Sequence, residues 1–279
     1  MRQEHTAGKI AARGRPDERE RTAMSDWKMD RWKFYDITHR RHMLCNPTSL
    51  SKLDDVIALL GLKPGARVVD IACGKGELLA RLAERYGVSG VGVDLSPFCI
   101  ADAREKLAER APLAKIEFVQ MDGAKYRPEP PESFDLVSCI GASWVFGGHR
   151  GTLRALKGMA AQGGYVFVGE PFWIKEPDPE HLKFDELTRE MFADHYGNVR
   201  IAEEEGLVPL YAAVSSGDDW DRYEMLQWFA ADEYAAANPD DPDLLEIQEK
   251  MAHAREVYLR WQRETLGWAL YLFRKPASQ

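Results

Sequence analysis

The sequence predicts an α/β protein with a doubly wound β-sheet. An apolar run, Val68–Ile71, carries an acidic residue, Asp70, and leads into a glycine-rich turn over 72–76, after which an amphipathic helical pattern begins at once. A second apolar run, Gly90–Val93, ends in Asp94. The order strand, glycine turn, helix, strand and acid is typical of a sheet that binds a nucleotide-like ligand, because glycines let the backbone approach the ligand and the acid meets the ribose hydroxyls.

Each element follows from local signals. A helix is expected from about Ser51, with an apolar face and Gly61 as its stop, and Ser96-Pro97 is a cap and first-turn signal for the helix after Asp94. The proline-rich stretch 123–133 is expected to be a loop. Seven strands are expected, at 67–71, 89–93, 115–120, 134–140, 164–169, 207–214 and 268–274.

Three parts of the chain differ in composition. Residues 1–23 are polar and mixed in charge, so we expect a disordered extension. Residues 24–50 are aromatic and basic, and we expect them to form a lid over the active site. Residues 51–279 form the main domain, with two helical insertions, at about 175–205 and 218–266. Most aromatic side chains of the second insertion are expected to form the core of a small cap, with a minority facing a ligand.

The acidic surroundings of the glycine turn bear on the ligand. A dinucleotide fingerprint places a diphosphate at the helix start, but Asp70 and Glu77 flank this turn and disfavour a diphosphate. A ligand with positive charge and no phosphate fits better. S-adenosylmethionine, which carries a sulfonium and an amino group, is such a ligand.

Four motifs stand in a recognisable order, and through them the chain resembles the class I S-adenosylmethionine-dependent methyltransferases from about Leu53 to Lys275. The motifs are Asp70-Ile71-Ala72-Cys73-Gly74-Lys75-Gly76, Gly92-Val93-Asp94-Leu95-Ser96, Gln120-Met121-Asp122-Gly123 and Phe134-Asp135-Leu136-Val137-Ser138-Cys139-Ile140-Gly141. Ala72 stands where many members have glycine. Segments 35–40 and 169–173 also resemble bacterial methyltransferases of unassigned substrate, loosely grouped with cyclopropane-fatty-acid-synthase-like enzymes. The resemblance implies a Rossmann-like, mostly parallel seven-stranded sheet with an antiparallel last strand.

The resemblance also implies roles for the cofactor-binding positions. Asp70 and the backbone at Ala72, Gly74 and Gly76 would hold the methionine moiety, and Asp94, followed by Leu95, would bind the ribose. Beyond them, Asp122 and the Gly123 amide would read the adenine, and the backbone of Ile140 and Gly141 would meet the methionine end.

The acceptor side offers four catalytic candidates. Glu170 ends the fifth strand and is expected at the catalytic rim, as a base or as a binding group for a cationic substrate; capping of nearby backbone is the structural alternative. His149 follows two glycines and is either in the cleft or a surface residue at a helix start. Tyr35 and His39 are four apart, share a helical face and are expected to reach inward from the lid. His39 and His42 have metal-ligand spacing, but no third ligand is suggested, so no metal site is predicted.

Composition limits the substrate class and the compartment. The net charge is −8, which disfavours a groove that tracks phosphates and hence a nucleic-acid substrate. The four cysteines lack metal-type pairing, and free thiols in a reducing cytoplasm are expected. No apolar run is long enough to span a membrane, and no basic amphipathic helix for a lipid surface is evident.

The sequence therefore predicts an enzyme that methylates a small-molecule nucleophile at nitrogen, sulfur or oxygen by in-line displacement. Two alternatives stay open. One is a protein or RNA methyltransferase, and the other is a non-catalytic S-adenosylmethionine-binding protein. The identity of the acceptor and the oligomeric state cannot be read from the sequence.

Overall fold

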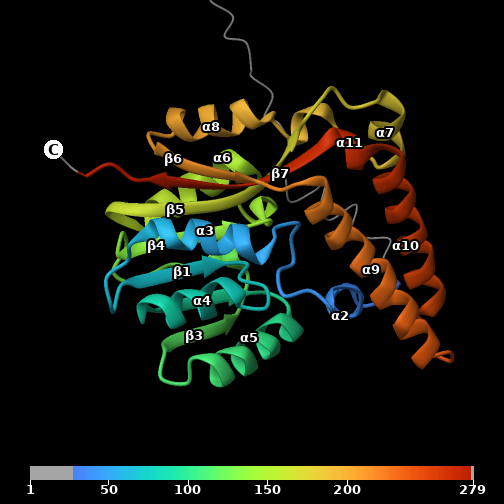
Figure 1. The fold of residues 1–279 in the computed structure, drawn as a ribbon, viewed down its shortest axis with the longest axis horizontal. Helices are drawn as coiled ribbons and strands as arrows, with labels where there is room; N and C mark the ends of the chain where they lie inside the picture. The colour runs from blue at the N-terminus through green and yellow to red at the C-terminus, as the bar shows by residue number, and fades with distance from the viewer. Residues whose placement is uncertain (1–27, 278–279) are drawn as a thin grey trace, which may run out of the picture.

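The computed structural model describes residues 28–277, so the expected extension 1–23 and the first residues of the expected lid lie outside the described residues. A seven-stranded sheet forms the centre of the molecule, with helices on both faces (Figure 1). The strands are β1 (Arg67–Ile71), β2 (Ser89–Asp94), β3 (Lys115–Gln120), β4 (Phe134–Ile140), β5 (Ala160–Trp173), β6 (Val208–Val214) and β7 (Leu266–Arg274).

The strand order is β3-β2-β1-β4-β5-β7-β6, which confirms the doubly wound, Rossmann-like sheet. The chain winds outward from β1 through β2 to β3, then returns to the other side of β1 with β4. The carboxyl ends of β1 and β4 therefore flank the topological switch point. Ligands of open α/β sheets bind in the crevice outside such a point.

The last strand is antiparallel, as expected. β7 lies between β5 and β6 and pairs antiparallel with both, so that Trp173 at the end of β5 lies opposite Leu266. All seven expected strands are present, and β5 is longer than the expected 164–169 at both ends. The pairing with β7 explains the extension at the carboxyl end, because hydrogen bonds from the neighbouring strand continue to Trp173.

Two apolar layers cover the sheet. On one face, α3 (Leu50–Leu60), α4 (Glu77–Tyr86) and α5 (Pro97–Arg110) form a core with Phe118 and Phe167. On the other face, α6 (His149–Met159) and α8 (His195–Glu204) pack on residues such as Val69 and Phe273. The expected helix signals are confirmed: Gly61 ends α3 in the left-handed region, and the Ser96 hydroxyl caps α5 by accepting from the Cys99 amide.

The remaining elements lie mainly beyond the carboxyl edge of the sheet. They are α2 (Arg31–His39), α7 (Pro179–Phe184), α9 (Gly217–Ala237), α10 (Leu244–Val257), α11 (Arg263–Thr265), the 3₁₀ turns η1 (Gly123–Lys125), η2 (Ser143–Phe146) and η3 (Arg189–Met191), and the π-helical turn η4 (Tyr258–Gln262). The stretch expected as a loop after Asp122 contains only η1 and is otherwise irregular. Within residues 28–277, no helix combines the length and apolarity needed to cross a membrane.

A third apolar cluster joins the N-terminal segment to the second insertion. Phe34 and Ile37 of α2 are buried against Ala231 of α9 and against Ile247 and Met251 of α10. Figure 1 shows α2 beside α9, with α9 and α10 running along each other. The N-terminal helix is therefore anchored on the insertion by apolar contacts.

Candidate functional site

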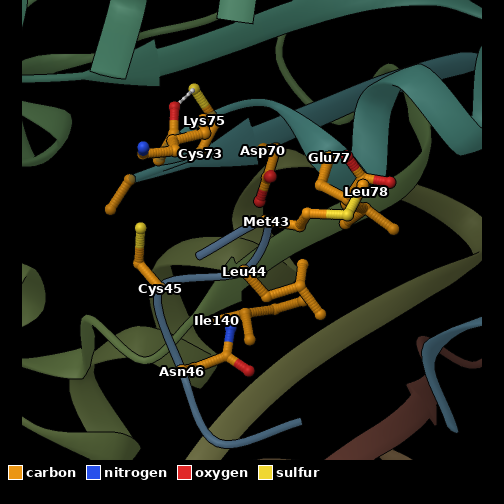
Figure 2. A pocket seen from close by; sticks show the side chains of 12 residues that line it. Met43, Leu44, Cys45, Asn46, Asp70, Cys73, Lys75, Glu77, Leu78 and Ile140 are labelled. Atoms are coloured by element: carbon orange, nitrogen blue, oxygen red, sulfur yellow. Dashed lines mark hydrogen bonds between the residues drawn. The ribbon is translucent and has the colours of Figure 1, made fainter. Parts of the chain in front are cut away.

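A narrow pocket opens at the carboxyl end of β1, at the switch point of the sheet. Figure 2 shows the glycine-rich turn and the start of α4 on one side, and the segment 43–46 with Ile140 on the other. The lining residues are Met43, Leu44, Cys45, Asn46, Asp70, Ala72, Cys73, Gly74, Lys75, Glu77, Leu78 and Ile140. Four of the predicted cofactor-binding residues thus meet in one cavity, together with a part of the N-terminal segment.

The turn after β1 has the backbone of a ligand cradle. Ala72, Gly74 and Gly76 have positive φ angles of 55°, 51° and 68°. A Cβ at position 76 would lie 2.8 Å from the Ala103 Cβ and 3.0 Å from the Phe118 ring, so only glycine fits there. Ala72 adopts the left-handed conformation that glycine adopts more readily, and therefore carries backbone strain.

Asp70 faces the pocket from the end of β1 and is only 4% exposed. The Ser138 hydroxyl donates to its carboxyl at 2.7 Å. Burial, with a smaller contribution from the nearby Asp94 carboxylate, raises the pKa of Asp70 to about 7, although the Ser138 hydrogen bond acts in the opposite direction. A cationic group placed in the pocket would favour the ionised form of this carboxyl.

Asp94 ends β2 and organises the turn. One carboxylate oxygen accepts from the Gly74 amide at 2.9 Å, and the other accepts from the Ser96 amide at 2.8 Å. Burial raises the pKa of Asp94. Each carboxylate oxygen has a second lone pair, so two ribose hydroxyls can still be accepted. The neighbouring Leu95 is 37% exposed beside it.

The third and fourth motifs contain the carboxyl ends of β3 and β4, and of their predicted site residues only Ile140 lines the pocket. Asp122 accepts from the Ala124 amide at 2.9 Å, and a Cβ at Gly123 would lie 2.6 Å from the Ile71 side chain. Gly141 has a φ of 80°, and a Cβ there would lie 3.0 Å from the Trp268 ring. At both glycines the backbone thus lies close to a neighbouring side chain.

The N-terminal segment lines the pocket with residues 43–46 and contacts α9 just before them. His39 is buried, and its Nε2 lies 3.0 Å from the Tyr223 hydroxyl of α9, while His42 Nε2 lies 2.8 Å from the Tyr223 carbonyl oxygen. Burial and the nearby His42 lower the pKa of His39 to about 3, so this imidazole is neutral. Tyr35 is 45% exposed and does not line the pocket.

Glu170 and His149, expected separately, lie together. Glu170 is 3% exposed, and its Oε1 lies 3.4 Å from His149 Nδ1, while His149 Nε2 contacts the Asn198 carbonyl oxygen. Neither atom of the pair has a hydrogen bond among the described residues. The pair does not line the pocket at the switch point.

Sequence reasoning missed several pocket residues. Met43, Leu44 and Asn46 were expected only as part of a lid, without individual roles. Asn46 Oδ1 is buried without a hydrogen-bond partner among the described residues, in a cavity whose cradle and carboxyl suit a cationic amino acid moiety. No local pattern marks Asn46, because the contact arises only when residues 43–46 fold across the sheet edge. Across residues 28–277, no three His, Cys, Asp or Glu side chains form a metal-binding group.

Comparison with known proteins gives one family. Residues 68–164 match the family model described as a methyltransferase domain. A crystal structure of an S-adenosylmethionine-dependent methyltransferase from Thiobacillus denitrificans, in complex with S-adenosyl-L-homocysteine, is 30% identical and has a TM-score of 0.80, and the match covers 88% of this chain and 99% of that one. The chain belongs to the class I S-adenosylmethionine-dependent methyltransferases.

Two further proteins resemble this methyltransferase over most of their length. The crystal structure of a second S-adenosylmethionine-dependent methyltransferase, from Geobacter sulfurreducens, also contains S-adenosyl-L-homocysteine. It is 28% identical with a TM-score of 0.81, and the match covers 86% of this chain and 97% of that one. YjhP of Escherichia coli is 29% identical over 245 residues, which is 87% of this chain and 98% of YjhP. This methyltransferase is therefore an enzyme with S-adenosylmethionine as its cofactor, as expected.

Proposed function

We propose that this methyltransferase transfers the methyl group to a small-molecule nucleophile at nitrogen, sulfur or oxygen. The observation that carries the proposal is the cover over the pocket. Residues 43–46 line it opposite the glycine-rich turn (Figure 2), and the helix before them is held on α9 by buried apolar contacts. A site covered in this way suits a small acceptor better than a macromolecule, and the net charge of −8 disfavours nucleic acid.

The residues of the cradle would divide the cofactor between them. Asp70, the Asn46 carbonyl and the backbone from Ala72 to Gly76 would hold the methionine end, and Asp94 would bind the ribose hydroxyls. Asp122 and Gly123 would meet the adenine, and Ile140 and Gly141 would place backbone beside the methionine. The bound cofactor supplies an electrophilic methyl group on a sulfonium.

The protein's contribution to the reaction would be mainly positional. Methyl transfer is an in-line displacement, so nucleophile, carbon and sulfur must be collinear, and holding two substrates at attack distance lowers the barrier. The lid segment would exclude water from the site. Glu170 with His149, and Tyr35 with His39, stay predictions as catalytic groups, since the first pair is buried outside the pocket lining and Tyr35 is half-exposed.

Turnover tests the proposal. The protein is incubated with S-adenosylmethionine and a panel of small amines, thiols and phenols, and S-adenosylhomocysteine formation is measured. We expect one class of small molecule to raise product formation well above the acceptor-free rate. Product formation only with protein or RNA acceptors would overturn the small-molecule assignment.

A further inference from the structure

Glu224 carries a carboxyl group on α9. No hydrogen bond or ion pair to it is found among the described residues, and burial raises its pKa to about 7. Asp221, one turn earlier, is by contrast fully engaged, since it accepts from the Tyr258 hydroxyl at 2.7 Å and from Arg263 at 2.9 Å. A half-buried carboxyl without a cation costs free energy, which a cationic ligand would offset.

Aromatic side chains flank this carboxyl. Trp220, Glu224 and Trp228 are spaced four apart and therefore share one face of α9. Both tryptophan rings contact Tyr258, with centroids 6.3 Å and 6.1 Å away. We call Trp220, Tyr223, Glu224, Trp228 and Tyr258 the α9 cluster. Tyr258 begins the π-helical turn η4, a type of helix distortion that is frequent at functional sites.

The two tryptophans also present unused donors. The indole N–H groups of Trp220 and Trp228 are buried and have no hydrogen-bond partner among residues 28–277. Buried tryptophan N–H groups usually find an acceptor. One helical face thus combines an unpaired carboxyl, two unpaired donors and several aromatic rings.

The α9 cluster contacts, through Tyr223, the chain segment that leads into the pocket lining. This residue precedes Glu224, and it contacts His39 through its hydroxyl and His42 through its carbonyl oxygen. His42 is followed directly by residues 43–46, which line the pocket. The α9 cluster is therefore connected, through His42, to the residues that line the pocket.

We propose that the α9 cluster binds the methyl acceptor and that this acceptor is a small organic amine, held as its ammonium form by Glu224 against the tryptophan rings. The proposal rests on the proposed function and specifies its substrate class. A carboxylate pairs with an ammonium group directly, and aromatic faces attract cations. The indole N–H groups would donate to an oxygen of the amine substrate.

The same carboxylate accounts for the proton. An ammonium nitrogen has no free electron pair, so it must lose a proton before it attacks, and the Glu224 carboxylate accepts that proton. The new nitrogen–carbon bond forms as the carbon–sulfur bond breaks, and the electron pair of the broken bond stays on sulfur. The products are the methylated amine, as its cation, and S-adenosylhomocysteine.

Calorimetry on the whole chain tests this proposal without turnover. S-adenosylhomocysteine is titrated first, and then propylammonium or phenethylammonium chloride is titrated into the saturated protein. We expect an ammonium ion to bind the wild type, and Glu224→Gln to bind it at least about tenfold more weakly with unchanged S-adenosylhomocysteine affinity. Asp232→Asn, which removes an exposed charge from the same helix, is the matched control and should bind like the wild type.

A neutral ligand and a second variant complete the calorimetric test. The neutral 2-phenylethanol should bind much more weakly than phenethylammonium. Trp228→Phe keeps an aromatic ring but removes the N–H, and it should weaken amine binding by about threefold. This variant provides the test of the amine site if Glu224→Gln does not fold. Equal amine affinity in the variants, equal binding of the alcohol, or no amine binding to a protein that binds S-adenosylhomocysteine would overturn the amine site. Failure to bind S-adenosylhomocysteine would instead contradict the proposed function itself.

Discussion

Asp94 at the end of β2 accepts a hydrogen bond from the Gly74 amide at 2.9 Å, and this contact fixes the glycine-rich turn after β1 against the neighbouring strand. The residue proposed to bind the ribose is therefore also a support of the cradle. A change at Asp94 acts on the cofactor directly and through the turn.

Asp94→Ala should weaken S-adenosylhomocysteine binding at least tenfold, because each hydrogen bond between a hydroxyl and a carboxylate contributes about 1.5–3 kcal/mol. The loss of the Gly74 and Ser96 contacts should also lower the free energy of unfolding by about 1–2 kcal/mol. Calorimetry and denaturant unfolding measure the two effects. Asp55→Ala on the exposed side of α3 is the control. If both variants bind S-adenosylhomocysteine with the same affinity, Asp94 is not a cofactor-binding residue.

Ala72→Gly should stabilise the protein by up to about 1 kcal/mol, because Ala72 has a φ of 55° and glycine adopts that conformation without strain. Gly76→Ala should do the opposite and cost about 2 kcal/mol or more, since its Cβ would lie 2.8 Å from Ala103. Denaturant unfolding of the two variants provides the comparison. A loss of stability in Ala72→Gly would show that the turn is not strained at this position.

Cofactor binding should depend on pH through Asp70. The pKa of Asp70 in the folded protein, about 7, lies above its ordinary value, so the fold without cofactor favours the protonated carboxyl. The free energy of unfolding therefore decreases as the pH rises from about 4 to about 7 and this carboxyl ionises. A bound cation favours the ionised form, so S-adenosylmethionine affinity should rise with pH up to and somewhat beyond 7. Calorimetry between about pH 5 and pH 8 measures this, with Asp70→Asn expected to flatten the profile. An unchanged profile in Asp70→Asn would assign the dependence to another group.

His39→Ala should reduce turnover by loosening the contact between α2 and α9. The sequence predicts that this substitution changes the melting temperature little. In the structure, however, His39 Nε2 forms a hydrogen bond with the Tyr223 hydroxyl. The substitution removes this partner of the hydroxyl, which should lower the free energy of unfolding by about 1–3 kcal/mol. Tyr35→Phe, at a half-exposed position, should be milder in stability. Activity per folded molecule is the deciding measurement, and unchanged activity in both variants would make the segment purely structural.

Glu170→Gln distinguishes a catalytic from a structural role for the buried pair with His149. If Glu170 takes part in proton transfer, kcat should fall at least about tenfold and the pH profile should change, while S-adenosylhomocysteine affinity stays constant. Steady-state kinetics over a range of pH measures this. A drop in melting temperature with an unchanged kcat would indicate that the pair only supports the end of β5.

The sequence by itself determined the sheet and the cofactor cradle, because both depend on local signals. Apolar runs mark strands, and the glycines of 72–76 permit a backbone that approaches a ligand, so β1 to β4 and the positions of Asp70 and Asp94 follow from residues close together in the chain. Even the antiparallel last strand is confirmed, although its prediction came from the family resemblance.

Only the tertiary structure decided what surrounds the cradle. His39 meets Tyr223, 184 positions later, and Glu170 meets His149 because β5 and α6 lie side by side. Among residues 28–277, Glu224 has no hydrogen-bond or ion-pair partner because of what packs around α9, and no spacing along the helix reveals this. Contacts between distant segments depend on which faces turn toward each other and on the shared burial of apolar surface, and a one-dimensional pattern records neither.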